Sequence, residues 1–154
     1  MDRKKNIFDK IGSLIPGYRG YAEREGRRQC DKLLREQVVS ILEQCETTIN
    51  TLIDESIKNR NPEKTKIFED NRKRLNTLTA KIKFSPYGAS AFFSNSQIKE
   101  SELEQIYKND LEILERANSF KQFIEDKSSK DINPSIEEIV ALLDARNQFI
   151  KEFK

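Results

Sequence analysis

The sequence predicts an all-α fold, an elongated antiparallel helical bundle of four main helices preceded by a short N-terminal amphipathic helix. Charged residues make up 35% of the chain and hydrophobic residues 36%, a balance typical of long, solvated helices. Glycine and proline number only 5 and 4, so the turns that would separate many short strands have few places to form. Apolar residues also recur at spacings of three and four along most of the chain, which favours helices.

The length predicts one domain. A chain of 154 residues can bury a sizeable core but is short for two independent domains. We therefore expect a single helical-bundle domain over residues 1–154. It would contain an N-terminal amphipathic helix with a glycine-tyrosine corner over residues 1–21, and an uncharged aromatic loop over residues 84–98.

The first expected helix has one apolar face, made of Ile7, Phe8, Ile11, Leu14 and Ile15. If this face bound a membrane, five half-buried side chains would give a dissociation constant only on the order of 10⁻⁴ M. We therefore favour packing of this face on the bundle, and keep a membrane surface or a partner as alternatives.

A corner follows this helix. Pro16 and Gly17 suit the two central positions of a type II turn, because proline presets φ near −65° and glycine supplies the positive φ that comes next. Gly20 permits a second unusual backbone conformation between Tyr18 and Tyr21. We expect a rigid corner whose tyrosines pack on the bundle end, with an anion site at the turn as the alternative.

A long helix is predicted from about residue 22 to residue 60. Its apolar seam advances by three and four residues and consists of Leu34, Val38, Ile41, Cys45, Ile49 and Leu52. A basic row lies about 115° from that seam and consists of Arg24, Arg28, Lys32 and Arg35. Glu23, Arg27 and Asp31 are spaced by four, so we interpret them as solvated local ion pairs.

The next helix begins at a clear signal, since Asn61 can cap it and Pro62 suits its first position. It should end near residue 83, and its apolar row is Ile67, Leu75, Leu78 and Ile82. Because this helix is shorter than its predecessor, we expect it to leave the N-terminal half of the long helix uncovered. The uncharged loop that follows carries four aromatic residues, Phe84, Tyr87, Phe92 and Phe93, and we expect it to meet Tyr18 and Tyr21.

Two further helices are predicted from capping boxes, at Ser101 to Glu104 and at Ser135 to Glu138. The first of these two helices runs to about residue 127 and buries Leu103, Tyr107, Leu111, Leu114, Phe120 and Ile124. The second buries Ile136, Ile139, Val140, Leu143, Ile150 and Phe153. Many acids lie on the first of them, among them Glu104, Asp110, Glu112 and Glu115, and we interpret these as solvated side chains rather than a catalytic pair.

The composition argues against several chemistries. The chain has no histidine, so the usual zinc ligands and the histidine ligands of a bundle di-iron centre are missing. Cys30 and Cys45 would lie about 22 Å apart on one helix, so they cannot pair with each other. We interpret both as inert core thiols and predict no catalytic residue, no metal, no cofactor and no enzymatic activity.

The run from Leu14 to Tyr21, Leu-Ile-Pro-Gly-Tyr-Arg-Gly-Tyr, is followed by Arg24-Glu25, Arg28 and Asp31-Lys32. This stretch of about 20 residues resembles the opening of small uncharacterised bacterial helical proteins. The resemblance implies a helical fold and carries no activity.

We predict a non-enzymatic interaction or scaffold protein that binds an unidentified protein partner through its N-terminal tyrosine and arginine segment. Aromatic and arginine side chains of this kind are typical of interface hot spots. The candidate partner-binding residues are Tyr18, Arg19, Tyr21, Arg24, Arg28, Lys32 and Arg35.

An alternative function is peripheral binding of an anionic surface, membrane lipid or nucleic acid, through basic residues 3–35. A homodimer along the N-terminal half of the long helix is a further prediction. No segment approaches the roughly 20 apolar residues of a membrane span, so we expect a cytoplasmic protein, with peripheral membrane contact as an alternative.

Overall fold

The computed structural model describes residues 3–84, 91–94, 97–126 and 132–153. These residues form five α-helices and one 3₁₀ turn and contain no strand, which confirms the all-α prediction. The elements are α1 (Arg3–Leu14), η1 (Arg24–Gly26), α2 (Arg27–Lys58), α3 (Pro62–Lys83), α4 (Glu100–Glu125) and α5 (Asn133–Glu152).

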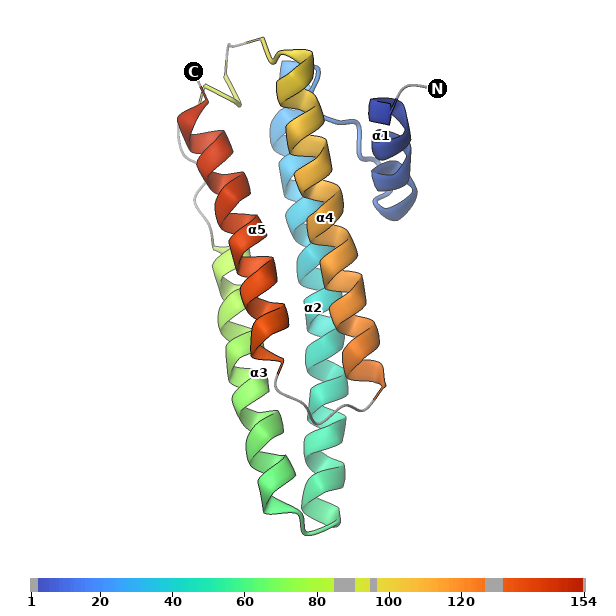
Figure 1. Ribbon diagram of the computed structural model, residues 1–154, viewed down its shortest axis with the longest axis vertical. Coiled ribbons are helices and arrows are strands. Elements are labelled where there is room, and N and C mark those ends of the chain that lie inside the picture. The colour runs from blue at the N-terminus through green and yellow to red at the C-terminus, as the bar shows by residue number, and fades with distance from the viewer. Residues whose placement is uncertain (1–2, 85–90, 95–96, 127–131, 154) are drawn as a thin grey trace.

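The four long helices form an elongated bundle in which α2 and α4 run in one direction and α3 and α5 in the other, so α2 is antiparallel to α3 and parallel to α4 (Figure 1). The helix α2 packs against α3 and α4, and α5 packs against the other sides of α3 and α4. The end of the bundle at which α2 turns into α3 extends past the ends of α4 and α5 (Figure 1). None of the helices in the described ranges is long and apolar enough to cross a membrane.

The short helix α1 packs beside the bundle on α4, as the sequence predicted (Figure 1). Ile11 and Ile15 are buried there, whereas Leu14 is exposed. The predicted type II turn is present, because the Tyr18 amide donates to the Ile15 carbonyl at 3.2 Å and Gly17 has a φ of +85°. This turn carries the chain from α1 across the end of the bundle.

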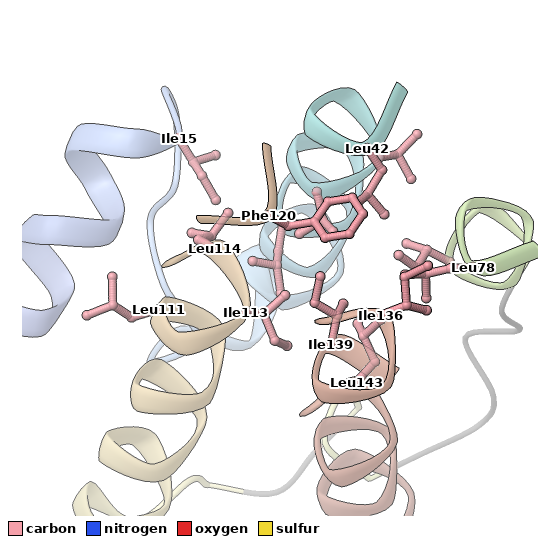
Figure 2. Packing of buried hydrophobic residues seen from close by; sticks show 14 of the residues in the cluster. Ile15, Leu42, Leu78, Leu111, Ile113, Leu114, Phe120, Ile136, Ile139 and Leu143 are labelled. Carbon is pink, nitrogen blue, oxygen red and sulfur yellow. The ribbon is translucent and has the colours of Figure 1, made fainter. Parts of the chain in front are cut away.

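One hydrophobic cluster joins side chains of all five helices. Figure 2 shows Leu42 of α2, Leu78 of α3 and Phe120 of α4 pointing toward one another, next to Ile139 of α5. The whole predicted seam of the long helix is buried. The prediction that its N-terminal half is uncovered is wrong, because α4 also packs against α2 and α3 reaches back to Arg35, so Cys30, Leu34 and Val38 are buried.

The long helix begins five residues later than predicted, at Arg27 instead of about residue 22. The backbone bends at Tyr21, whose N–H and C=O both bond to side chains, of Tyr107 and Arg27, in place of helical partners. Only after the short turn η1 can the backbone start the helical hydrogen-bond ladder.

The start of α3 is confirmed, since the Asn61 side chain accepts a hydrogen bond from the Lys64 amide at 3.2 Å and Pro62 opens the helix. The apolar row that the sequence predicted for α3 is partly wrong. Ile67 is exposed, and its neighbour Phe68 is buried in its place. Phe84 is 80% exposed, so the expectation that this end of the aromatic loop is covered is also wrong.

Neither predicted capping box forms where the sequence predicted it. The helix α4 starts two residues early, and Glu102 rather than Glu104 accepts a hydrogen bond from the amide of the N-cap Lys99 at 3.0 Å. The helix α5 starts at Asn133 with Pro134 in its first turn, so Ser135 lies inside the helix. The packing positions that the sequence predicted on α4 are nevertheless all buried.

Candidate functional site

A group of polar and charged side chains lies inside the bundle, where the corner meets α2, α4 and α5. We call Tyr18, Tyr21, Asp31, Asp110 and Arg146 the buried polar cluster. Asp110 is 0% exposed and Arg146 is 2% exposed. Charged residues are almost never buried to this extent unless they are paired.

Arg146 of α5 joins the cluster through three hydrogen bonds. Its Nε donates to Asp110 Oδ1 at 2.7 Å, its Nη1 donates to Asp31 Oδ1 at 2.6 Å, and its Nη2 donates to the Tyr21 hydroxyl at 2.8 Å. Arg35 lies 3.3 Å from the second oxygen of Asp31. Two carboxylates and two guanidinium groups therefore balance in charge.

Asp110 of α4 fixes the corner to the bundle. Its Oδ2 accepts hydrogen bonds from the hydroxyls of Tyr18 at 2.9 Å and Tyr21 at 2.5 Å. Burial raises the pKa of Asp110 above its ordinary value, and the positive charge of Arg146 opposes that rise. Burial also raises the pKa of both tyrosines well above the usual value, so their hydroxyls stay protonated as donors.

Gly20 lets the chain pass close to α4 and α1. Its φ is +85°, and a Cβ at this position would collide with the Tyr107 hydroxyl and lie 2.6 Å from the ring of Phe8. The close approach allows the Tyr107 hydroxyl to accept a hydrogen bond from the Tyr21 amide at 2.9 Å. The glycine that the sequence singled out is therefore required by both backbone conformation and space.

The described part of the aromatic loop closes the cluster. The Tyr21 and Phe92 ring centroids lie 5.3 Å apart, which confirms that the loop meets the corner. Arg27, which is buried, donates from Nε to the Tyr21 carbonyl at 2.9 Å and from Nη1 to the Phe92 carbonyl at 3.0 Å. Tyr87 lies outside the described residues.

The cluster is arranged to hold structure together rather than to react with a substrate. Its hydroxyls, carboxylates and guanidinium group are hydrogen-bonded to one another, and a cleft of about 230 Å³ between α4 and α5 touches only Arg146 among them. Burial raises the pKa of the neighbouring Cys30 thiol to about 12, so it is a poor nucleophile. Among the described residues, no group of three or more ligand side chains is placed to hold a metal ion.

The structure divides the predicted partner-binding residues into two sets. Tyr18 and Tyr21 are buried in the cluster, so the prediction that they present aromatic surface to a partner is wrong. Arg35 is also turned inward, where its Nη1 donates to the Ile82 carbonyl at 3.2 Å. Four exposed residues remain, and we call them the basic surface: Arg19, Arg24, Arg28 and Lys32.

Arg28 lies against an aromatic ring. Its guanidinium carbon lies 4.9 Å from the centroid of the Phe93 ring, a cation–π distance. Arg24 lies in η1 and contacts Glu25 at 3.8 Å, and Lys32 lies about one turn beyond Arg28 on α2 and contacts Glu36 at 3.9 Å. These ion pairs are exposed, and such pairs contribute little to stability.

Sequence reasoning missed Arg146, and its interpretation of Arg27, Asp31 and Asp110 as solvated is wrong, because all three are buried. The sequence did contain a signal for Asp110 and Arg146. Apolar residues recur every three or four positions along both helices, and each of these two charged residues stands where that spacing calls for an apolar one. Arg146 lies between Leu143 and Ile150, three and four residues away. A charged residue within an apolar stripe indicates a buried partner on another helix.

Comparison with known proteins gave no match, neither to a protein-family model nor to a curated protein nor to a solved structure.

Proposed function

We propose that this chain is a non-enzymatic interaction protein that binds an acidic segment of a partner protein through the basic surface. The observation that carries the proposal is the separation of roles within the N-terminal segment. The tyrosines, Arg27 and Asp31 are buried, whereas Arg19, Arg24, Arg28 and Lys32 are exposed.

The contact between Arg28 and the Phe93 ring makes Arg28 suitable for recognition. The cation–π contact orders Arg28 before a partner arrives, which lowers the conformational entropy lost on binding. Guanidinium groups also pair with carboxylates through two parallel hydrogen bonds. The partner should therefore present Asp or Glu side chains to this surface.

The alternative of binding lipid or nucleic acid draws less support. The apolar face of α1, which would enter a membrane, packs on α4 through Ile11 and Ile15. The net charge of the chain is only +2. Both modes of binding would weaken as the salt concentration rises, and the release of condensed counterions would make the fall steeper for a nucleic acid.

The test is affinity capture from native extract with three forms of the chain. One variant carries Arg24→Glu and Arg28→Glu, and a matched control carries Lys66→Glu and Lys73→Glu on exposed positions of α3, so both variants have the same net charge. We expect a defined protein to be retained by the wild type and the control and lost by the first variant. Equal retention by all three forms would contradict the proposal, provided that circular dichroism shows each form to be folded.

A further inference from the structure

The cleft between the neighbouring helices α4 and α5 contains hydrogen-bonding groups that the described residues leave unused (Figure 1). Its volume of about 230 Å³ is room for a small molecule rather than for a single water. Ile106 and Arg146 are 1% and 2% exposed and form its floor, whereas Lys108 and Ala145 are exposed and lie at its mouth. The cleft therefore joins the solvent to the edge of the buried polar cluster.

One of the unused groups is an acceptor, the side-chain oxygen of Asn109. This residue is half-buried and lines the cleft, and its Oδ1 is shielded from solvent yet accepts no hydrogen bond from the described part of the chain. Asn109 directly precedes Asp110, which holds the Nε of Arg146. A buried amide oxygen is normally hydrogen-bonded, and leaving it without a donor is costly. A molecule in the cleft that carries an N–H group would satisfy it.

The other unused groups are donors on Arg146. Its guanidinium group has five N–H groups, and three of them donate to Asp110, Asp31 and the Tyr21 hydroxyl. One N–H on Nη1 and one on Nη2 therefore remain for an acceptor. The charge of Arg146 is already balanced by the two carboxylates, so the acceptor that suits it best is an uncharged carbonyl oxygen.

The remaining walls favour a flat, apolar and uncharged group. The Phe149 ring is half-buried and lines the cleft together with Ile106. Aromatic rings pack well against another ring, either offset or edge to face. Lys108 and Glu112 bring one charge of each sign to the lining, so neither a cation nor an anion is favoured overall.

We propose that this cleft binds a small uncharged aromatic carboxamide. The amide N–H of the ligand donates to Asn109 Oδ1, its carbonyl oxygen accepts from Arg146, and its ring packs against Ile106 and Phe149. A lining with apolar walls and a few polar groups that fix orientation is typical of small-molecule sites. The inference does not rest on the proposed function, because it concerns a separate site from the basic surface.

The test is an NMR titration of the isotope-labelled chain with benzamide, followed through the backbone amide signals. Acetophenone is the matched control ligand, because it has the same ring and carbonyl group but no N–H. We expect benzamide to shift the signals of residues 105–112 and 145–149 until they saturate. Acetophenone should bind about tenfold more weakly, because the Asn109 oxygen then stays unpaired.

Two pairs of variants locate the site. Asn109→Leu removes the acceptor, and Asn118→Leu makes the same change at an exposed position of α4. Ala145→Leu narrows the cleft, and Ala141→Leu adds the same side chain at another exposed position of α5. We expect Asn109→Leu and Ala145→Leu to weaken benzamide binding about tenfold and both controls to bind as the wild type does. The preference for benzamide over acetophenone should disappear in Asn109→Leu.

The amide spectrum of each variant shows whether it is folded. Equal binding of benzamide and acetophenone by the wild type, or wild-type affinity in Asn109→Leu, would overturn the inference. A titration with no saturable shift at the cleft would also overturn it and leave the cleft to ordered water. The capture experiment with Arg24→Glu and Arg28→Glu tests the proposed function separately, and its result leaves each of these outcomes unchanged.

Discussion

At the scale of single residues, the chain places its charges in two very different environments only a few positions apart. Arg27 and Arg28 are neighbours in the sequence, yet Arg27 is buried against backbone carbonyls and Arg28 lies on the surface over Phe93. The helix turns by 100° per residue, so adjacent residues face different surroundings. The role of each arginine in this segment therefore follows from its position around the helix rather than from its type.

The buried charges of the cluster depend on one another. We expect Arg146→Met to lower the free energy of unfolding by about 3–5 kcal/mol, because Asp110 loses the cation that compensates its buried charge. Chemical denaturation would measure the change. The loss should shrink as the pH is lowered, since protonation removes that uncompensated charge from Asp110.

A control for this variant is Arg116→Met, because Arg116 is exposed and its ion pair with Glu138, at 3.8 Å, is exposed too. Its free energy of unfolding should stay within about 0.5 kcal/mol of the wild type. A similar effect of both variants would argue against the cluster as a source of stability.

Gly20 is the most constrained position of the corner. We expect Gly20→Ala to lower the free energy of unfolding by about 1–3 kcal/mol from its backbone conformation alone, with a further loss from the collision with Tyr107 and Phe8. Thermal or urea denaturation would show the effect. Gly12→Ala is the matched control, because nothing lies within 4 Å of its Cβ position and alanine favours the helix α1. A Gly20→Ala protein as stable as wild type would show that the corner is not held as described.

At the scale of helices, the ends are decided by small local differences. The sequence offers acids at several positions near the start of α4, and Ser101 with Glu104 fits the capping pattern as well as the arrangement that forms. The structure uses Lys99 and Glu102 because the helix begins where Leu103 and Ile106 first face the core. Tertiary packing thus selects among several local options.

The position of this cap can be tested by a pair of substitutions. We expect Glu102→Ala to lower the free energy of unfolding by roughly 0.5–1 kcal/mol, through loss of its bond to the Lys99 amide and of its charge near the helix start. Glu104→Ala should have almost no effect, since alanine is the better helix former at an exposed position. Urea denaturation of both variants would measure the two changes. A larger loss of stability in Glu104→Ala than in Glu102→Ala would favour the cap predicted from the sequence.

At the scale of the whole molecule, burial keeps thiol and phenol groups protonated at alkaline pH, where the same groups would lose their protons in the unfolded chain. The pKa of both thiols, of Cys30 and Cys45, is raised to about 12 from an ordinary 9.0, and burial is the main cause. The tyrosines of the cluster, Tyr18 and Tyr21, have a raised pKa for the same reason. The folded state therefore holds more protons than the unfolded state above pH 9.

We expect the free energy of unfolding to fall as the pH rises from 9 to 12. A folded pKa above the unfolded value gives stability that is complete below the unfolded pKa and lost above it, at up to about 1.4 kcal/mol per pH unit for each group. Urea denaturation at pH 8, 9, 10 and 11 would measure the slope. Cys45→Ala should lower the slope between pH 9 and 10 by about a third, because it removes one of the two thiols while the tyrosines also contribute. A stability that stays constant to pH 11 would contradict the burial of these groups.

The sequence by itself determined the helices, the type II turn at Pro16 and Gly17, the cap at Asn61 and most of the apolar core. These features depend on residues within a few positions of one another, and a period of 3.6 residues is visible in any single chain. The sequence also indicated that the aromatic loop would reach the corner, because an uncharged loop with several aromatic residues is costly to leave in water.

Only the tertiary structure decided which charged residues are buried and which remain available to a partner. Tyr18 meets Asp110 across 92 positions of the chain, and Asp31 meets Arg146 across 115. No local pattern shows that two such groups will face each other, since a buried charge is stable only when its partner is present. Pairing across the bundle thus buries the tyrosines, as the corner prediction expected and the partner-binding prediction did not, and leaves the basic surface, Arg19, Arg24, Arg28 and Lys32, outside.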